Sequence, residues 1–125
     1  MPEDITSILL VEDNRLISFQ LSNELKELGY QIISAFSGEE AIKSARTCNP
    51  DIILMDVNLD EDRDGVEIMR IIHDENGFIP NIFLTGYSKE ELVNRIENAF
   101  RAVILEKPVK IEALKEKIKL LALNK

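Results

Sequence analysis

DIILMDVNLD, residues 51–60, is an apolar run that ends in a carboxylate. Residues 52–55 are all apolar, which is typical of a parallel strand covered on both faces, and we expect a strand over residues 51–55. Asp56 follows directly, where a carboxylate adds nothing to the packing of the strand. Ligands of open parallel sheets bind beyond the carboxyl ends of the strands. The stretch therefore predicts a buried parallel strand with a functional acid, Asp56, at its end.

Short apolar strands alternate with amphipathic helices along the rest of the chain. Strands that alternate with helices favour a parallel sheet, because each right-handed crossover between parallel strands needs a helix. We therefore predict an α/β, doubly wound, three-layer fold with a five-stranded parallel sheet, in one domain spanning residues 1–125. The expected strands are residues 7–11, 31–35, 51–55, 81–84 and 102–105, and the expected helices are about 14–28, 37–47, 66–74, 88–100 and 111–123.

Helix signals in the sequence support these boundaries. Ser37 and Ser88 are each followed three residues later by a glutamate, a pattern typical of a capping box. Asn49-Pro50 is expected to end the second helix. In the first helix, an apolar stripe at helical spacing is expected to face the core. That stripe consists of Leu16, Ile17, Leu21, Leu25 and Leu28.

Composition excludes several classes of protein. The chain of 125 residues carries a net charge of −8, which disfavours non-specific binding to nucleic acid or to anionic membranes, and we expect neither partner. The opening residues MPEDITS are too polar for a signal peptide, and no window is apolar enough to span a membrane. The single Cys48 cannot form an intramolecular disulfide and agrees with a reducing compartment. We therefore expect a cytoplasmic protein.

Polar side chains fall at the ends of the other strands too. Glu12 and Asp13 follow the first, Thr85 the fourth and Lys107 the fifth, and all should face Asp56 along one edge of the sheet. Acids brought together repel unless a cation lies between them, and Mg²⁺ suits such an oxygen-rich site. A carboxylate beside Mg²⁺ can attack a phosphoryl group. Lys107 and Thr85 can then bind phosphate oxygens.

Four of these stretches together resemble the receiver domain of two-component response regulators. They are ILLVEDN (residues 8–14), IILMD (52–56), IFLTG (82–86) and LEKP (105–108), in the order and spacing of that family. Each is weak alone, but the four are specific together, and the resemblance covers the whole chain. It implies a flavodoxin-like sheet with strand order 2-1-3-4-5.

The resemblance also implies a phosphorylation site. Asp56 would accept a phosphoryl group from a sensor histidine kinase or a histidine phosphotransfer domain. Glu12, Asp13, Asp56 and the backbone carbonyl of Asn58 would hold Mg²⁺. Lys107 would contact the phosphoryl group. Such a domain promotes only its own phosphorylation and dephosphorylation, so we do not expect an enzyme that acts on an external substrate.

A switch is implied as well. Thr85 would move toward the phosphate and change the face built from the fourth helix, the fifth strand and the fifth helix, where a downstream protein would bind. The Lys107–Pro108 bond would be cis. The family usually has an aromatic residue three positions before the lysine. Here that position is Ile104, which cannot make the same ring flip. The loop after Asp56 is also longer and more acidic than usual.

Other interpretations stay open at this point. A receiver-like interaction module that is not phosphorylated would explain Ile104, and a free phosphohydrolase would use an aspartyl intermediate, although the DxDx[TV] signature is missing around Asp56. Residues 60–65 resemble the start of an EF-hand loop, but Ile71 stands where a bidentate acid is needed. His73 is expected to be a surface residue. Both a stand-alone regulator and a piece of a larger protein fit the sequence.

Overall fold

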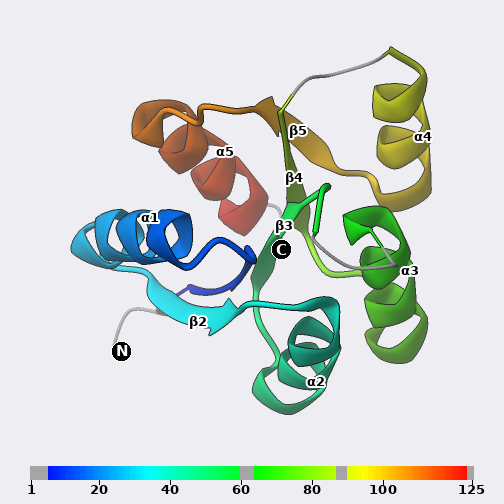
Figure 1. The fold of residues 1–125 in the computed structure, drawn as a ribbon, viewed down its shortest axis with the longest axis horizontal. Helices are drawn as coiled ribbons and strands as arrows, with labels where there is room; N and C mark the ends of the chain where they lie inside the picture. Colours follow the sequence, from blue (N-terminus) through cyan, green and yellow to red (C-terminus); the bar gives the residue numbers. More distant parts are fainter. Residues whose placement is uncertain (1–5, 60–63, 87–89, 124–125) are drawn as a thin grey trace.

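The computed structural model describes residues 6–59, 64–86 and 90–123. These residues form a parallel sheet with strand order β2-β1-β3-β4-β5, as the sequence predicted (Figure 1). The elements along the chain are β1 (Ser7–Val11), α1 (Arg15–Glu27), β2 (Gln31–Ala35), α2 (Gly38–Cys48), β3 (Ile52–Asp56), α3 (Gly65–Asn76), β4 (Asn81–Thr85), α4 (Glu90–Phe100), β5 (Val103–Glu106) and α5 (Ile111–Leu123).

Helices cover both faces of the sheet and make three layers. The alternation of side chains along β3 shows this directly, because successive residues of a strand point to opposite faces. Ile52 and Leu54 pack with α1 and α5, whereas Ile53 and Met55 pack with α2, α3 and α4 (Figure 1). Every residue of β3 is buried, which explains its unbroken apolar sequence.

The third strand lies one residue later than the sequence suggested. Asp56 is the last residue of β3 and pairs with Leu84 of β4, so the carboxylate belongs to the strand. Asp51, expected to begin the strand, instead accepts a hydrogen bond of 2.8 Å from the backbone N–H of Ser7 through its side chain. Because that bond turns Asp51 toward β1, the ladder begins at Ile52.

The structure confirms the capping box predicted at Ser37 and adds a cap that the sequence did not predict, at Asp64. The Ser37 hydroxyl accepts from the N–H of Glu40, and the Glu40 carboxylate accepts from the N–H of Phe36, which completes the predicted capping box. The Asp64 carboxylate caps α3 by accepting from the N–H of Glu67. Ser88, the other predicted cap, and residues 60–63 of the EF-hand resemblance lie outside the described residues.

The buried face of α1 differs from the predicted leucine stripe. The residues of α1 that are buried are Ser18, Ser22 and Leu25, which share one face of the helix. Leu16 and Phe19 are 67% and 64% exposed. The prediction is confirmed for Leu25, and Leu21 packs partly buried against the core, but it was wrong for Leu16, Ile17 and Leu28, which are exposed. Apolar spacing alone does not distinguish a face that packs on the sheet from a neighbouring face of similar composition. Two small serines face the core instead.

His73 is not the surface residue that the sequence suggested. Its ring is half-buried between the edges of Phe78 and Phe100, with centroids 5.5 Å away in each case, and its Nε2 lies 3.2 Å from the Ile79 carbonyl oxygen. Burial lowers the pKa of His73, although the Ile79 carbonyl partly opposes this. The ring contacts come from residues later in the chain, which no local pattern around His73 predicts.

Candidate functional site

Acidic side chains from two strand ends converge on one point. Carboxylate oxygens of Glu12, Asp13 and Asp56 all lie within 4.8 Å of one another. Glu12 and Asp56 are only 2% and 3% exposed, and Asp13 is half-buried. Glu12 and Asp13 directly follow β1, and Asp56 ends the neighbouring β3. The structure therefore brings together the three acids that the sequence selected.

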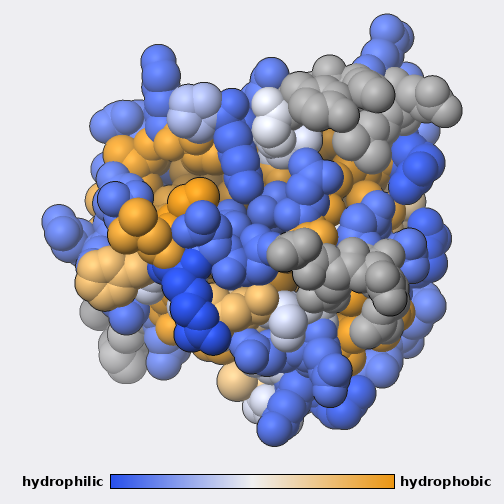
Figure 2. All heavy atoms as spheres, in the orientation of Figure 1, coloured by the Kyte–Doolittle hydropathy of each residue, from blue (hydrophilic) through white to orange (hydrophobic). Residues whose placement is uncertain are grey.

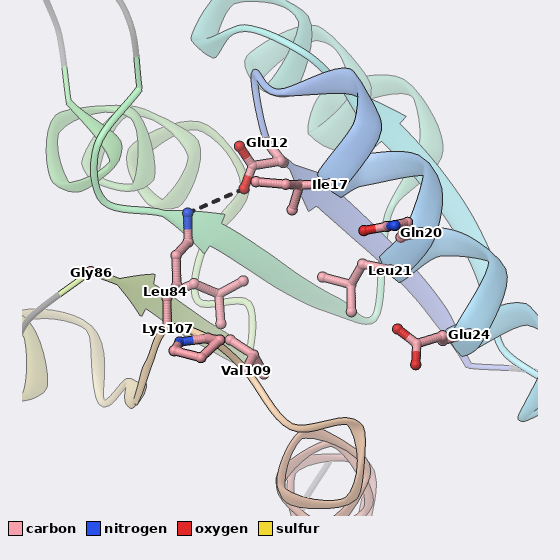
Figure 3. Close-up of a pocket in the computed structure, with 10 residues that line it drawn as sticks. Glu12, Ile17, Gln20, Leu21, Glu24, Leu84, Gly86, Lys107 and Val109 are labelled. Atoms are coloured by element: carbon pink, nitrogen blue, oxygen red, sulfur yellow. Dashed lines mark hydrogen bonds and ion pairs between the residues drawn. The ribbon is translucent and has the colours of Figure 1, made fainter.

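Lys107 joins this cluster from the end of β5. Its Nζ lies 3.1 Å from Oδ2 of Asp56. The same atom lies 3.3 Å from Oε1 of Glu12 (Figure 3). The backbone N–H of Lys107 donates to the Thr85 carbonyl, and the bond to Pro108 is cis, as predicted. Burial alone would lower the pKa of Lys107, but the two carboxylates outweigh it and raise that pKa above its ordinary value. Lys107 is therefore a firmly charged cation at neutral pH.

The electrostatics of Glu12 indicate that the acids are not fully compensated. Burial is the largest cause that raises the pKa of Glu12, and the nearby Asp56 charge adds to it. Hydrogen bonds from the N–H of Asn14 and from Lys107 lower it but do not restore the ordinary value. The ionised cluster is thus costly although the Lys107 ammonium lies beside it, and a further positive charge would stabilise it.

These donors fit Mg²⁺. Three carboxylates present oxygen atoms, which are the ligands that Mg²⁺ prefers, and they leave coordination positions for water and phosphate oxygens. The N–H of Asn58 donates to Oδ1 of Asp56 at 3.0 Å, so the loop that carries the predicted carbonyl ligand runs directly beside the acids. Asn58 as a ligand remains a prediction.

The two predicted switch residues lie on neighbouring strands. Thr85 ends β4 and is buried at the edge of the acid site, paired with Glu106 of β5. Ile104 lies opposite Phe83 in the β4–β5 register and packs, partly buried, against the core on the side of α2, α3 and α4. The structure places both residues where a rearrangement of the site could reach the α4 side of the sheet.

A pocket of about 510 Å³ opens beside the acids between α1 and the ends of β4 and β5 (Figure 3). Figure 2 shows hydrophobic atoms at the surface in the region of α1. Leu16, Ile17 and Phe19 of this helix are exposed. Sequence reasoning missed this surface because it assigned the α1 leucines to the core. The pocket is lined mainly by Glu12, Ile17, Leu21, Leu84, Lys107 and Val109.

The raised pKa of Glu12 makes a prediction for stability. Glu12→Gln should increase the free energy of unfolding at neutral pH without Mg²⁺, because it removes a buried charge that the fold disfavours. Because the pKa of the Glu12 carboxyl is higher in the folded state than in the unfolded state, protonation of Glu12 stabilises the native state. This stabilisation is complete below the ordinary pKa of 4.5 and is lost as the pH rises through the folded pKa. The advantage of the variant should therefore shrink as pH falls toward that value. Urea unfolding across pH measures it, with the exposed Glu27→Gln as control.

Sequence comparison with known proteins finds response regulators. The model of the response regulator receiver domain family matches residues 8–119. The transcriptional regulatory protein PdtaR of Mycobacterium tuberculosis is 35% identical over 108 residues, which are 86% of this chain and 52% of that protein. The chain thus spans about half the length of PdtaR. The polar-differentiation response regulator DivK of Brucella ovis is 32% identical over 115 residues, covering 90% of this chain and 93% of DivK.

Solved structures agree with the fold. The chemotaxis protein CheY4 of Vibrio cholerae superposes with a TM-score of 0.86 at 26% identity, covering 94% of this chain and 99% of that one. A two-component response regulator from Clostridium difficile superposes with a TM-score of 0.87 at 26% identity, covering 94% and 95%. Among the helices of the described residues, none has the length and apolar character needed to cross a membrane.

Proposed function

This chain belongs to the response regulator receiver family, and we propose that it accepts a phosphoryl group on Asp56 from a phosphohistidine of a sensor kinase or phosphotransfer domain. One observation carries the proposal: the Lys107 ammonium lies 3.1 Å from Asp56 and 3.3 Å from Glu12, with Asp13 in the same cluster. An acid held beside a cation and two further acids is suited to bind a metal and a phosphoryl group together. A purely structural ion pair would not need three acids.

The reaction is a transfer between two nucleophiles. A carboxylate oxygen of Asp56 forms a bond to phosphorus, the bond from phosphorus to the histidine nitrogen breaks, and the imidazole leaves with that electron pair. Bound Mg²⁺ would neutralise charge on the phosphoryl oxygens. Glu12, Asp13, Asp56 and the carbonyl of Asn58 would hold the ion. The product is an aspartyl phosphate on the chain itself and an unphosphorylated histidine on the donor, so the chain acts as a signalling phosphoacceptor and not as a turnover enzyme.

Lys107 has a role before and after transfer. Before transfer it holds the Asp56 carboxylate through the bond to Oδ2, while the Asn58 N–H holds Oδ1. These two bonds hold both carboxylate oxygens of Asp56 and limit the rotation of the side chain. After transfer the ammonium can pair with a phosphate oxygen, and the Thr85 hydroxyl can donate to another.

The phosphodonor would approach over α1. The pocket beside Asp56 has Ile17 in its wall, and Leu16 and Phe19 expose apolar surface on the same helix. A partner that brings a phosphohistidine to Asp56 would bury these side chains. The change at Thr85 would then alter the face of α4, β5 and α5, where a downstream protein binds. The setting would be a cytoplasmic phosphorelay, with no direct contact to nucleic acid or membrane.

Phosphorylation by a small donor tests the proposal without knowledge of the partner. The full chain is incubated with phosphoramidate and Mg²⁺ and analysed by intact-protein mass spectrometry. We expect the mass of one phosphoryl group to be added, and EDTA to prevent the addition. An unmodified protein under these conditions would contradict the proposal and favour the interaction module. Steady hydrolysis of a small phosphomonoester would instead favour the phosphohydrolase.

A further inference from the structure

Helix α3 begins directly on the main chain of Asp56. Gly65, the first residue of α3, is buried, and a β-carbon built on it would overlap the carbonyl oxygen of Asp56. The same β-carbon would lie 3.0 Å from the Asp56 carbonyl carbon and 2.9 Å from Cγ of Met55. The φ angle of Gly65 is outside the left-handed region, so close approach is what requires glycine here.

Hydrogen bonds connect this contact to the Asp56 carboxylate. The Gly65 N–H donates to the Val57 carbonyl at 2.9 Å, and the Val57 N–H donates to the Leu84 carbonyl at 2.9 Å. The next residue, Asn58, donates its N–H to Oδ1 of Asp56. Residues 57 and 58 therefore lie between α3, β4 and the Asp56 carboxylate. They are hydrogen-bonded to each of these three neighbours.

The sheet itself cannot yield to relieve an added methyl group. Asp56 is paired with Leu84 of β4 and is 3% exposed, and Met55 is fully buried. Buried side chains at native packing density leave no free volume for such a shift. A larger residue at position 65 must therefore displace the start of α3, and with it the Val57–Asn58 segment that α3 holds.

We propose that Gly65 is a positioning residue for phosphoryl transfer: it lets α3 rest on the Asp56 main chain and so fixes the segment that orients the Asp56 carboxylate. This inference rests on the proposed function and adds a requirement at a residue that contacts neither metal nor phosphate. It differs from a general packing role, because the displaced segment carries the Asn58 N–H that binds Oδ1 of Asp56.

Gly65→Ala tests the inference against Ile72→Val, which changes a fully buried residue later in the same helix. With saturating Mg²⁺, we expect the rate of phosphoramidate labelling of folded Gly65→Ala to fall about 10- to 100-fold, because small misplacements of a reacting group have effects of that size. The Asn58 amide proton resonance should move in Gly65→Ala and stay in place in Ile72→Val. Ile72→Val should label like the unchanged protein.

Each outcome decides a separate question. Labelling of Gly65→Ala at the unchanged rate, with the Asn58 resonance in place, would overturn the positioning role while the proposed function stands. Absence of labelling in the unchanged protein would overturn the proposed function and this inference with it. If Gly65→Ala does not fold, amide hydrogen exchange of the unchanged protein tests the inference instead. Addition of Mg²⁺ with beryllofluoride should slow the exchange of the Gly65 and Asn58 amides together. The exchange of the Gly77 amide should stay unchanged. An unaltered exchange rate at Gly65 would overturn the inference.

Discussion

Asp56→Asn is expected to abolish labelling by phosphoramidate and Mg²⁺. The carboxamide has nearly the same shape as the carboxylate but lacks its negative charge and its nucleophilic oxygen. Oδ1 of the amide can still accept the N–H of Asn58, so the loop after β3 should keep its conformation. The loss of labelling would therefore report the chemistry of one side chain. Intact-protein mass spectrometry over a time course measures it.

The matched control for this experiment is Asp51→Asn. Asp51 directly precedes the first residue of β3, at the opposite end from Asp56, and accepts a hydrogen bond from the backbone N–H of Ser7. The Asp51→Asn variant should be labelled at the same rate as the unchanged protein. Circular dichroism checks that the variant is folded. Labelling that survives in Asp56→Asn would refute Asp56 as the acceptor. Loss of labelling in both variants would mean that the substitutions disturb the strand, and it would not identify Asp56 as the acceptor.

Lys107→Ala is expected to destabilise the protein by about 2 kcal/mol without Mg²⁺, because two buried carboxylates lose their cation. The value lies below the usual cost of breaking a fully buried pair, since the Lys107 side chain is 28% exposed and solvent weakens the interaction. Millimolar Mg²⁺ should recover part of the loss by binding the native acids. Urea unfolding with and without Mg²⁺ measures both effects.

The pH dependence of this variant gives a second check. The raised pKa of Lys107 means that its stabilisation is complete below the ordinary lysine value of 10.5 and is lost as pH rises through the higher folded pKa. The difference between the unchanged protein and Lys107→Ala should therefore persist at neutral pH and shrink in strong alkali. Lys110→Ala, at an exposed lysine nearby, should change stability by less than about 0.5 kcal/mol. Equal effects of the two substitutions would contradict the role assigned to Lys107.

The site could be predicted from sequence because of the parallel sheet. Once the strands were recognised, Glu12, Asp56 and Lys107 were expected on the same edge, since the carboxyl ends of parallel strands share one edge. The order of the strands came from the family resemblance and not from the pattern of apolar residues. The cis bond before Pro108 came from the same source.

Other features depend on packing between distant segments, which no local pattern contains. The apolar stripe of α1 was assigned to the core because its spacing is helical, but Ser18 and Ser22 share the buried face with Leu25, and Leu16 is exposed. His73 looked solitary in the sequence, yet Phe100 from the end of α4 covers it. Gly65 falls in the sequence at the end of the loop before the third helix, and only the structure shows that Asp56 lies against it.

Reduction of the phosphorylated protein with sodium borohydride tests the central claim most directly. Borohydride converts an aspartyl phosphate to homoserine, and peptide sequencing by mass spectrometry then identifies the position. The account predicts homoserine at position 56 and at no other acidic residue, with none formed when Mg²⁺ is withheld. Conversion at Asp13 or Glu12, or a phosphorylated protein that yields no reduced residue at position 56, would contradict it.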